Sequence, residues 1–336
     1  MKILFIRFSS IGDIVLTTPA IRCTKNQLPE AELHFVCKKS FQQVMEHNPY
    51  ISKFFYLDNN LPQLITLLKQ EKYDYVIDLH KNYRSIRITK ALHTPVSRYQ
   101  KLSWQKFLLT KTGIDWMPQI HISQRCLNAV APLGVKDDGK GLDYFIAPSD
   151  RVATSDLPFS HLHGFVAVVI GASYFTKKLP VEKLQELCTK IPYPIILIGG
   201  KEDALEGDAI AKTDSIKIYN ACGKFSLNES ADLIRQSKVV VSHDTGMQYI
   251  ACAYQKNVVA IWGGTSPKLA VEPYYGSSVP INSKHTNFIV PNLKCQPCSN
   301  FGTATCPKKH FRCMQLQPID TIAQQVITYY TTNGNL

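Results

Sequence analysis

The sequence lacks any apolar run long enough to cross a bilayer, which argues against a membrane-spanning helix. Its first residues are apolar, but Arg7 and Asp13 interrupt them and no small-residue cleavage site follows. We therefore interpret them as a first strand of the mature protein rather than a signal peptide. The sequence also has no short repeat and no low-complexity tract, so a compact globular protein is expected.

Acidic residues are scarce relative to basic ones. The chain has 38 Lys and Arg against 26 Asp and Glu, for a formal net charge of +12. Such an excess favours partners that carry phosphate: nucleotides, nucleic acid, phosphorylated sugars or an anionic membrane face. Between Leu79 and Lys111 there is no acidic residue at all, and aromatic residues are interleaved with Lys and Arg. Because no recognisable nucleic-acid motif accompanies this segment, we do not expect nucleic acid as the partner.

The cysteines do not form the pattern of a disulfide framework. Of ten, five stand singly in expected strands or helices, which predicts reduced thiols and a cytoplasmic location. Four others lie in the stretch CQPCSNFGTATCPKKHFRCM together with His310: Cys295, Cys298, Cys306 and Cys313. A C-x-x-C pair followed by two cysteines resembles a zinc site, but the second pair is spaced too widely for a zinc ribbon. We favour reduced thiols and predict no metal.

Short apolar strands alternate with amphipathic helices along all 336 residues, the pattern of an α/β fold with parallel sheets. The expected strands cover 2–6, 32–37, 53–57 and 73–79 in the first half, and 165–171, 194–200, 216–221, 238–243 and 257–263 in the second. The expected helices cover 13–27, 40–47, 61–70, 84–92, 180–190, 202–212, 228–236, 245–255 and 318–332. Two Rossmann-like domains facing a cleft are the simplest architecture.

A stretch rich in Gly, Asp, Ser and Pro, from Gly134 to Gly164, is the best linker candidate. We therefore expect a first domain over 1–150 and a second over 151–317. The remaining segment, 318–336, carries a helical pattern and is expected to cross back to the first domain.

Three loops of the second half follow expected strands and so meet at one edge of the sheet. GASYFTKKLP carries Lys177 and Lys178. In SHDTG, Asp244 or Thr245 can cap the next helix, and Gly246 allows close approach to the backbone. Lysine charge and helix N–H groups suit a diphosphate. A capped turn without a ligand is the alternative for this motif taken alone.

The third loop, GGKED, follows the strand expected at 194–200. It offers a glycine pair, Gly199 and Gly200, and two carboxylates, Glu202 and Asp203. An acidic residue at this edge can accept hydrogen bonds from ribose hydroxyls. Together, the three loops predict a nucleotide site.

The first half has one comparable turn, in RFSSIGDIVLTTPA. There the first strand ends in Ser9 and Ser10, and Gly12 and Asp13 open an apolar helix. The carboxylate of Asp13 is either a helix cap or a general base. The residues of this turn alone leave both interpretations open.

Taken together, RFSSIGDIVLTTPA, GASYFTKKLP, GGKED and SHDTGMQYIACAYQKNVVAIWGGTSP resemble glycosyltransferase family 9, the heptosyltransferases of lipopolysaccharide inner-core assembly. The resemblance spans nearly the whole chain, with motifs in both halves. It implies the GT-B architecture and inverting transfer of heptose, or a related sugar, from an ADP-sugar donor to a lipopolysaccharide core acceptor. No cofactor is implied.

The resemblance also assigns roles to residues. Asp13 would be the general base, and Lys177, in the pattern Lys-x-x-Pro, would stabilise the leaving diphosphate. The donor would contact Ser9, Ser10, Gly12, Gly199, Gly200, Asp203, Asp244, Thr245 and Gly246. The family usually has a histidine three residues after that last glycine, where this chain has Tyr249. This departure puts the identity of the donor in doubt.

The acid-free segment would meet phosphorylated lipid A–core and the anionic inner leaflet of the membrane. Arg84 and Arg87, one helical turn apart, are the candidates for acceptor phosphates, and a solvated helix face is the alternative. Two other functions remain: a catalytically degenerate protein that binds nucleotide-sugar, and an NAD-dependent oxidoreductase. The latter is disfavoured because SSIGD is not G-x-G-x-x-G.

Overall fold

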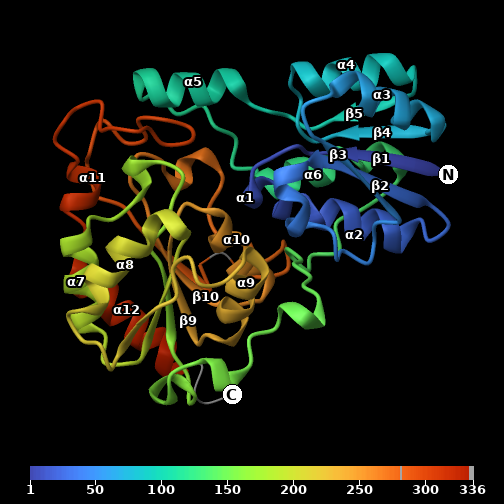
Figure 1. Cartoon of the computed structure of the whole chain (residues 1–336). Helices are drawn as coiled ribbons and strands as arrows, with labels where there is room; N and C mark the ends of the chain where they lie inside the picture. Colours follow the sequence, from blue (N-terminus) through green and yellow to red (C-terminus); the bar gives the residue numbers. More distant parts are fainter. Residues whose placement is uncertain (281, 333–336) are drawn as a thin grey trace. The chain divides into compact units, whose positions relative to one another are not determined.

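The computed structural model describes residues 1–280 and 282–332. The chain divides into two compact units, and each contains its own sheet (Figure 1). Unit 1 consists of Met1–Lys101, Ile120–Phe145 and Tyr274–Val279, and unit 2 of Leu102–Gln119, Ile146–Pro273 and Pro280–Leu336. No helix within the described residues is long and apolar enough to cross a membrane.

The sheet of unit 1 has five parallel strands in the order β3-β2-β1-β4-β5. They are β1 (Lys2–Ile6), β2 (Glu32–Lys38), β3 (Lys53–Leu57), β4 (Tyr75–Asp78) and β5 (Val96–Arg98). β1 is central: Ile3 pairs with Leu33 on one side and with Tyr75 on the other. Its apolar residues are fully buried because helices cover both faces of the sheet. The α/β expectation is confirmed here.

The helices of unit 1 are α1 (Ile11–Val15), α2 (Thr18–Gln27), η1 (Lys39–Val44), α3 (Leu61–Gln70), α4 (Tyr83–Leu92), α6 (Ile122–Asn128) and η2 (Ala131–Leu133). The helix expected over 13–27 is broken after Val15. Pro19 has no N–H to donate to the carbonyl of Val15, so an unbroken helix would lose that bond. The hydroxyl of Thr18 donates to this carbonyl instead, at 2.7 Å. Pro19 then stands in the first turn of α2, where proline is tolerated.

The sheet of unit 2 has six parallel strands in the order β11-β10-β9-β6-β7-β8. They are β6 (Val166–Val169), β7 (Ile195–Ile198), β8 (Ile218–Asn220), β9 (Val239–His243), β10 (Asn257–Ile261) and β11 (His285–Phe288). The five expected strands are all present, within a few residues at their ends. β11 was not expected from the sequence.

The helices of unit 2 are α5 (Ser103–Thr112), α7 (Val181–Lys190), α8 (Ala204–Ala211), α9 (Leu227–Gln236), α10 (Gly246–Ala253), α11 (Arg312–Gln315) and α12 (Ile319–Thr332). Short 3₁₀ helices complete it: η3 (Pro148–Asp150), η4 (Thr154–Asp156), η5 (Phe159–His161), η6 (Phe175–Lys177), η7 (Lys201–Asp203) and η8 (Pro267–Leu269). α7, α8 and α12 share one apolar core with the sheet, and α9 and α10 contact each other. The sequence suggested that α12 crosses back to the first domain; in the structure it packs on α7, β9 and β10.

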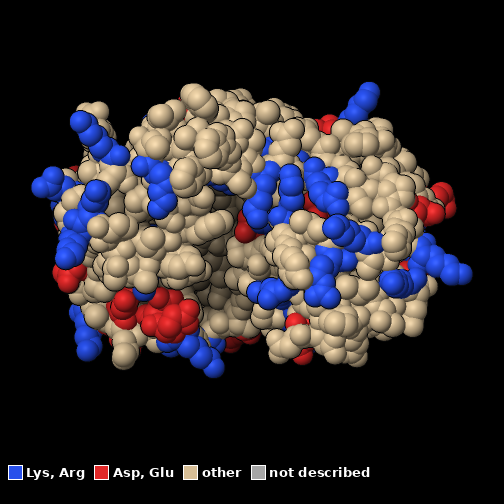
Figure 2. Space-filling view, turned by 90° about the horizontal axis from the view of Figure 1, so that it is seen from above, with Lys and Arg blue, Asp and Glu red and all other residues tan. Residues whose placement is uncertain are grey.

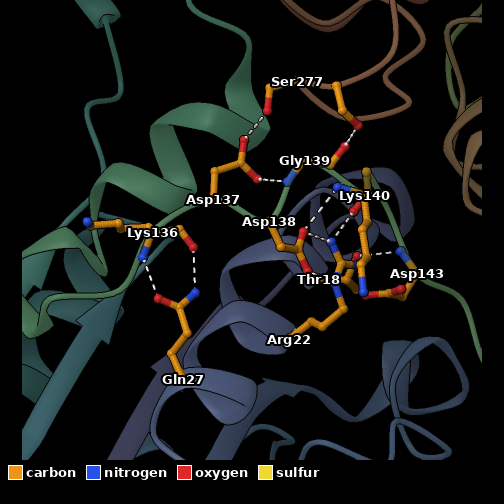
Figure 3. Close-up of polar contacts among 12 residues, drawn as sticks. Thr18, Arg22, Gln27, Lys136, Asp137, Asp138, Gly139, Lys140, Asp143 and Ser277 are labelled. Atoms are coloured by element: carbon orange, nitrogen blue, oxygen red, sulfur yellow. Dashed lines mark hydrogen bonds and ion pairs between the residues drawn. The ribbon is translucent and has the colours of Figure 1, made fainter.

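The beginning of the suggested linker is folded onto α2 in unit 1 (Figure 3). Arg22, which is buried, donates to both carboxylate oxygens of Asp138 at 2.8 Å and to the carbonyl of Gly141 at 2.9 Å. It also forms an ion pair with Asp143. Gly141 has φ +83°, and a Cβ there would lie 2.5 Å from the backbone of Tyr275. A buried guanidinium and a glycine contact therefore fix this stretch.

Candidate functional site

In unit 1, the turn after β1 holds the carboxylate of Asp13 at three points. Ser10 donates to Oδ2 from its backbone N–H, at 3.2 Å, and from its hydroxyl, at 3.0 Å. A guanidinium nitrogen of Arg7 lies 2.6 Å from Oδ1. The side chain of Asp13 nevertheless stays 29% exposed. Asp13 thus helps to cap α1 and keeps a face open to solvent, so the two interpretations of the sequence are compatible.

Arg7 is the fixed partner in this contact. Its side chain is buried, donates to the carbonyls of Ser9 and Leu79, and lies over the ring of Tyr99 at 5.6 Å. Sequence reasoning noted Arg7 only as an interruption of an apolar run. The missed signal is a basic residue at the end of a buried strand, six positions before an acid.

Burial alone would raise the pKa of Asp13, but the positive charge of Arg7 and the hydrogen bonds from Ser10 together hold it below its ordinary value of 3.8. Asp13 is therefore an ionised carboxylate at neutral pH. Nearby, burial and the charge of Arg7 lower the pKa of His80 to about 3, which keeps that imidazole neutral.

The two arginines expected to bind the acceptor have different surroundings. Arg84 lines a cavity of about 330 Å³ together with Lys38, Lys39 and Ser40, and with Leu57, Asp58, Asn59 and Leu61. The guanidinium of Arg87 lies over the ring of Tyr83, 5.7 Å from its centroid. Figure 2 shows Lys and Arg side chains gathered on the face of unit 1 that carries α3 and α4.

Sequence reasoning missed Lys38 and Lys39. Lys38 is the last residue of β2 and Lys39 follows it, at the carboxyl edge of the sheet, where ligands of α/β folds bind. A pair of lysines directly after a buried strand is the signal that could have identified them.

In unit 2, the loop carrying η6 meets the turn between β9 and α10. The ammonium of Lys177 lies 2.8 Å from a carboxylate oxygen of Asp244, and both side chains are largely buried. Nε2 of His243 accepts the backbone N–H of Leu179 at 3.0 Å. Burial lowers the pKa of His243 to about 3, so its neutral ring can accept this bond. Thr245 is the N-cap of α10, which begins at Gly246.

Asp203 is only 2% exposed, and its carboxylate is already occupied. Oδ2 accepts the N–H of Gly200 at 2.9 Å, and Oδ1 lies 2.8 Å from the ammonium of Lys178. A Cβ at Gly171 would lie 2.3 Å from Oδ2 of Asp203. In this structure Asp203 holds the turn after β7 together. The exposed carboxylate of that turn belongs to Glu202.

The glycine pair serves the same turn. A Cβ at Gly199 would lie 2.9 Å from the side chain of Asp203, and one at Gly200 would overlap the carboxylate of Glu202. Lys178 forms a second ion pair, with Glu206, at 2.6 Å. Burial would lower the pKa of Lys178, but these two carboxylates raise it. Lys178 thus belongs to this turn through two ion pairs.

Tyr249 points into the protein. It is buried, and its hydroxyl donates to the carbonyl of Val271 at 2.6 Å. The phenol therefore satisfies a backbone acceptor in the loop that follows η8.

The cysteines of the C-terminal loop make contacts typical of thiols. Sγ of Cys295 lies 3.8 Å from Nε2 of His310, and the thiol of Cys298 donates to the carbonyl of Gly264 at 3.5 Å. Burial, together with the neighbouring thiols, raises the pKa of Cys313 to about 12. No disulfide joins any of the ten cysteines, all of which lie within the described residues.

One group of three potential metal ligands lies close together within residues 1–280 and 282–332: Cys23, Asp137 and Asp138. Asp138 is already bound by Arg22 through both oxygens. Burial raises the pKa of the Cys23 thiol to about 11, which disfavours the thiolate that a metal needs.

The chain is similar to known proteins in sequence and in fold. The model of a family described as "Glycosyltransferase family 9 (heptosyltransferase)" matches residues 62–309. The chain belongs to glycosyltransferase family 9. Lipopolysaccharide heptosyltransferase 1 of Campylobacter coli is 23% identical over 296 residues, which cover 79% of this chain and 84% of that protein.

Solved structures agree on the fold of this family 9 protein. A family 9 glycosyltransferase from Veillonella parvula superposes with a TM-score of 0.77 at 19% identity, over 98% of this chain and 97% of that one. The E. coli heptosyltransferase WaaC with ADP-2-deoxy-2-fluoro heptose gives a TM-score of 0.64 at 19% identity, over 85% and 92%. The expected GT-B architecture and the expected family are confirmed. The protein is a glycosyltransferase, and its relatives include proteins named lipopolysaccharide heptosyltransferases.

Proposed function

We propose that this family 9 enzyme transfers heptose, or a related sugar, from an ADP-sugar to the core of a lipopolysaccharide acceptor, with inversion at the anomeric carbon. The observation that carries the proposal is the carboxylate of Asp13, fixed by Arg7 and Ser10 but still exposed. It is supported by the relative that was solved with an ADP-linked heptose analogue. We assign the contacts to the diphosphate and the ribose to residues of unit 2, and the base and the contacts to the acceptor to residues of unit 1.

In the reaction, the acceptor oxygen bonds to the anomeric carbon while the bond from that carbon to the diphosphate oxygen breaks. The acceptor proton passes to Asp13, and ADP leaves with the electron pair. A single displacement of this kind inverts the anomeric centre. Although its low pKa makes Asp13 a weak base, the acceptor oxygen becomes acidic as its bond to carbon forms, so a carboxylate suffices.

On the donor side, Lys177 meets the negative charge that builds up on the leaving diphosphate. The backbone N–H groups of Thr245 and Gly246, at the start of α10, provide further donors. We assign the ribose hydroxyls to Glu202, because its carboxylate is exposed, and assign to Asp203 the support of the same turn. Gly12 and Ser9 allow close approach of a substrate to the turn that carries Asp13.

On the acceptor side, Arg84 with Lys38 and Lys39 provides a positive cavity for a phosphate or carboxylate of the core. Arg87, over Tyr83, is placed as a second, more peripheral contact. We further propose that the protein works in the cytoplasm, at the anionic surface of the inner membrane, where a lipid A–core acceptor is anchored.

The test compares wild-type protein with Asp13→Asn, an isosteric change that removes the charge. Transfer from ADP-heptose to lipid A–core should fall by at least about a hundredfold, the usual contribution of a general base. Binding of ADP should be retained, because Asp13 is not among the residues assigned to the diphosphate or the ribose. Thermal shift measures this binding, since a ligand of the native state raises its melting temperature.

The alternatives give different results in the same assays. A degenerate nucleotide-sugar-binding protein would show the thermal shift with ADP but no transfer by wild type. An oxidoreductase would show a shift with NAD(H) and none with ADP-sugars. Equal transfer rates for wild type and Asp13→Asn would reject Asp13 as the base.

A further inference from the structure

Helix α5 of unit 2 exposes two aromatic side chains that stack on each other. Trp104 is 63% exposed and Phe107 is 49% exposed, and their rings lie 5.8 Å apart at an angle of 18°. Because they are three residues apart, they lie on one face of the helix. The chain after the helix adds Ile114 and Trp116, of which Trp116 is 66% exposed. Four large apolar side chains are thus exposed within the short stretch 104–116, and exposed apolar surface of this kind is typical of a binding site.

The opposite side of α5 holds the helix on unit 2. Leu109 and Met117 are buried, and they form a small apolar cluster with Leu269 and Ala270 at the end of η8. The exposed aromatic residues are not part of this cluster. The exposed aromatic side chains are therefore not needed to attach the helix to unit 2, and they are available to bind a partner.

The charges around this face are mostly positive. α5 itself carries Lys106 and Lys111 and no acidic residue, and Lys268 of η8 is exposed beside the apolar cluster. The acidic residue of the 102–119 segment is Asp115, on the connection after the helix. Exposed aromatic residues flanked by lysines match an anionic lipid surface, where rings sit at the headgroup level and lysines bind phosphates.

We propose that α5 and the connection to Trp116, the 103–116 element, dock this enzyme onto an anionic membrane by inserting Trp104, Phe107 and Trp116 at the interface. A ten-residue helix is about 15 Å long, too short to span the bilayer but sufficient to lie in its surface. The biological purpose of this docking rests on the proposed function, since a lipid-anchored acceptor must be reached at the membrane. The docking itself requires no substrate.

The experiment measures vesicle binding without donor or acceptor. Wild-type protein is co-sedimented with vesicles of phosphatidylethanolamine and phosphatidylglycerol, and with vesicles of phosphatidylcholine alone. We expect binding to the anionic vesicles only, and a loss of about tenfold or more in binding for the double variant Trp104→Ala/Phe107→Ala. Lys111→Glu should also weaken binding, since it reverses a charge at the surface.

The matched control is Phe159→Ala/Ile216→Ala. Both residues are exposed apolar side chains of unit 2, and a hydrogen bond from Ser160 to the carbonyl of Ile216 brings their segments together. This variant removes a similar apolar area elsewhere and should bind vesicles as wild type does.

Tryptophan fluorescence gives a second readout. Trp262 is fully buried, so a blue shift on adding vesicles reports Trp104 and Trp116. Quenching by brominated lipids should be strong for wild type and weak for the double variant.

Three results would overturn the proposal: equal vesicle binding by the double variant, no blue shift, or loss of self-association in light scattering when Trp104 and Phe107 are removed. The last would make the face a contact between copies of the chain. If docking fails while transfer to a soluble, deacylated acceptor proceeds, the docking proposal is rejected and the proposed function is retained. If docking occurs without any transfer, only the proposed function fails.

Discussion

Arg7 and Asp13 show how one carboxylate can help to cap a helix and still keep part of its surface exposed. Ser10 occupies one oxygen of Asp13 and Arg7 the other, yet part of the side chain faces solvent. A carboxylate held in this way is already oriented before a substrate binds, so no substrate binding energy is needed to orient it. The local sequence predicted Asp13 as a candidate base, which stays a prediction. It did not reveal Arg7 as the partner of Asp13, because a single charged residue after an apolar strand gives no indication of what it contacts.

Replacing Arg7 with Met should raise the pKa of Asp13, since the nearest positive charge is removed while burial remains. The acid limb of the kcat/KM profile should then move to higher pH. A depressed folded pKa contributes stability that is present above the unfolded pKa, near 3.8, and is lost as the pH falls through the folded value. Urea unfolding should therefore show Arg7→Met less stable by about 1–3 kcal/mol at pH 7, and this difference should shrink in acid.

Arg7→Lys is the control, because it keeps the charge near Asp13. A pH profile of Arg7→Met identical to that of wild type would show that Asp13 does not titrate in the rate-limiting step.

Glu202 and Asp203 are adjacent carboxylates with different surroundings, and substitution should separate their roles. Glu202→Gln should weaken ADP binding, because its exposed carboxylate is assigned to the ribose, and should leave stability unchanged. Asp203→Asn should lower stability by about 1–3 kcal/mol, since Lys178 loses a buried partner. Isothermal titration with ADP and urea unfolding measure the two effects. Weakened ADP binding by Asp203→Asn alone, at full stability, would reverse the assignment.

At the scale of elements, apolar runs in the sequence predicted most strands, but they did not predict two short, partly polar strands at the edges of the sheets. β1, β2 and β3 lie where the sequence placed them, because each is composed mainly of apolar residues, KILFI, ELHFVCK and KFFYL. β5 and β11 were missed: VSR and HTNF are short, partly polar edge strands that take their form from a neighbour. Helix α5 was missed as well, since its aromatic face points outward instead of marking a buried stripe.

The stretch that Arg22 binds, around Asp138 and Gly141, should tolerate only glycine at position 141. Gly141→Ala places a methyl group 2.5 Å from the backbone of Tyr275 at φ +83°, so it should destabilise unit 1 by about 2–4 kcal/mol. Gly134→Ala is the matched control: its φ is +79°, but nothing lies within 4 Å, so only the strain of about 1 kcal/mol remains. Thermal unfolding compares the two. Equal losses would mean that the contact with Tyr275 adds nothing.

At the scale of the whole molecule, the excess of positive charge predicted an anionic partner, and the structure concentrates part of it around one cavity in unit 1. Composition alone fixed the sign of the charge but not its location. The sequence predicted Arg84 and Arg87 equally as contacts for acceptor phosphates. The fold distinguishes them, because Arg84 lines a cavity and Arg87 lies over the ring of Tyr83.

Arg84→Ala should raise the KM for a phosphorylated acceptor about tenfold or more, since it removes a charge-assisted contact in the cavity. Arg87→Ala should have a smaller effect, and neither variant should change ADP affinity. Added salt should raise the wild-type KM and should affect Arg84→Ala less. Steady-state kinetics at two ionic strengths test this. A larger effect of Arg87→Ala would show that the acceptor binds outside the cavity.

Because Lys177 already neutralises Asp244, the resting enzyme presents little uncompensated charge there to stray anions. A diphosphate bound at Lys177, as proposed, would have to displace the carboxylate of Asp244, so its affinity would reflect the difference between two ion pairs. Inorganic phosphate, lacking the nucleoside and sugar contacts, should be a poor inhibitor despite its abundance. If ADP leaves from Lys177 as proposed, the return of Asp244 to this ammonium would favour release of the product.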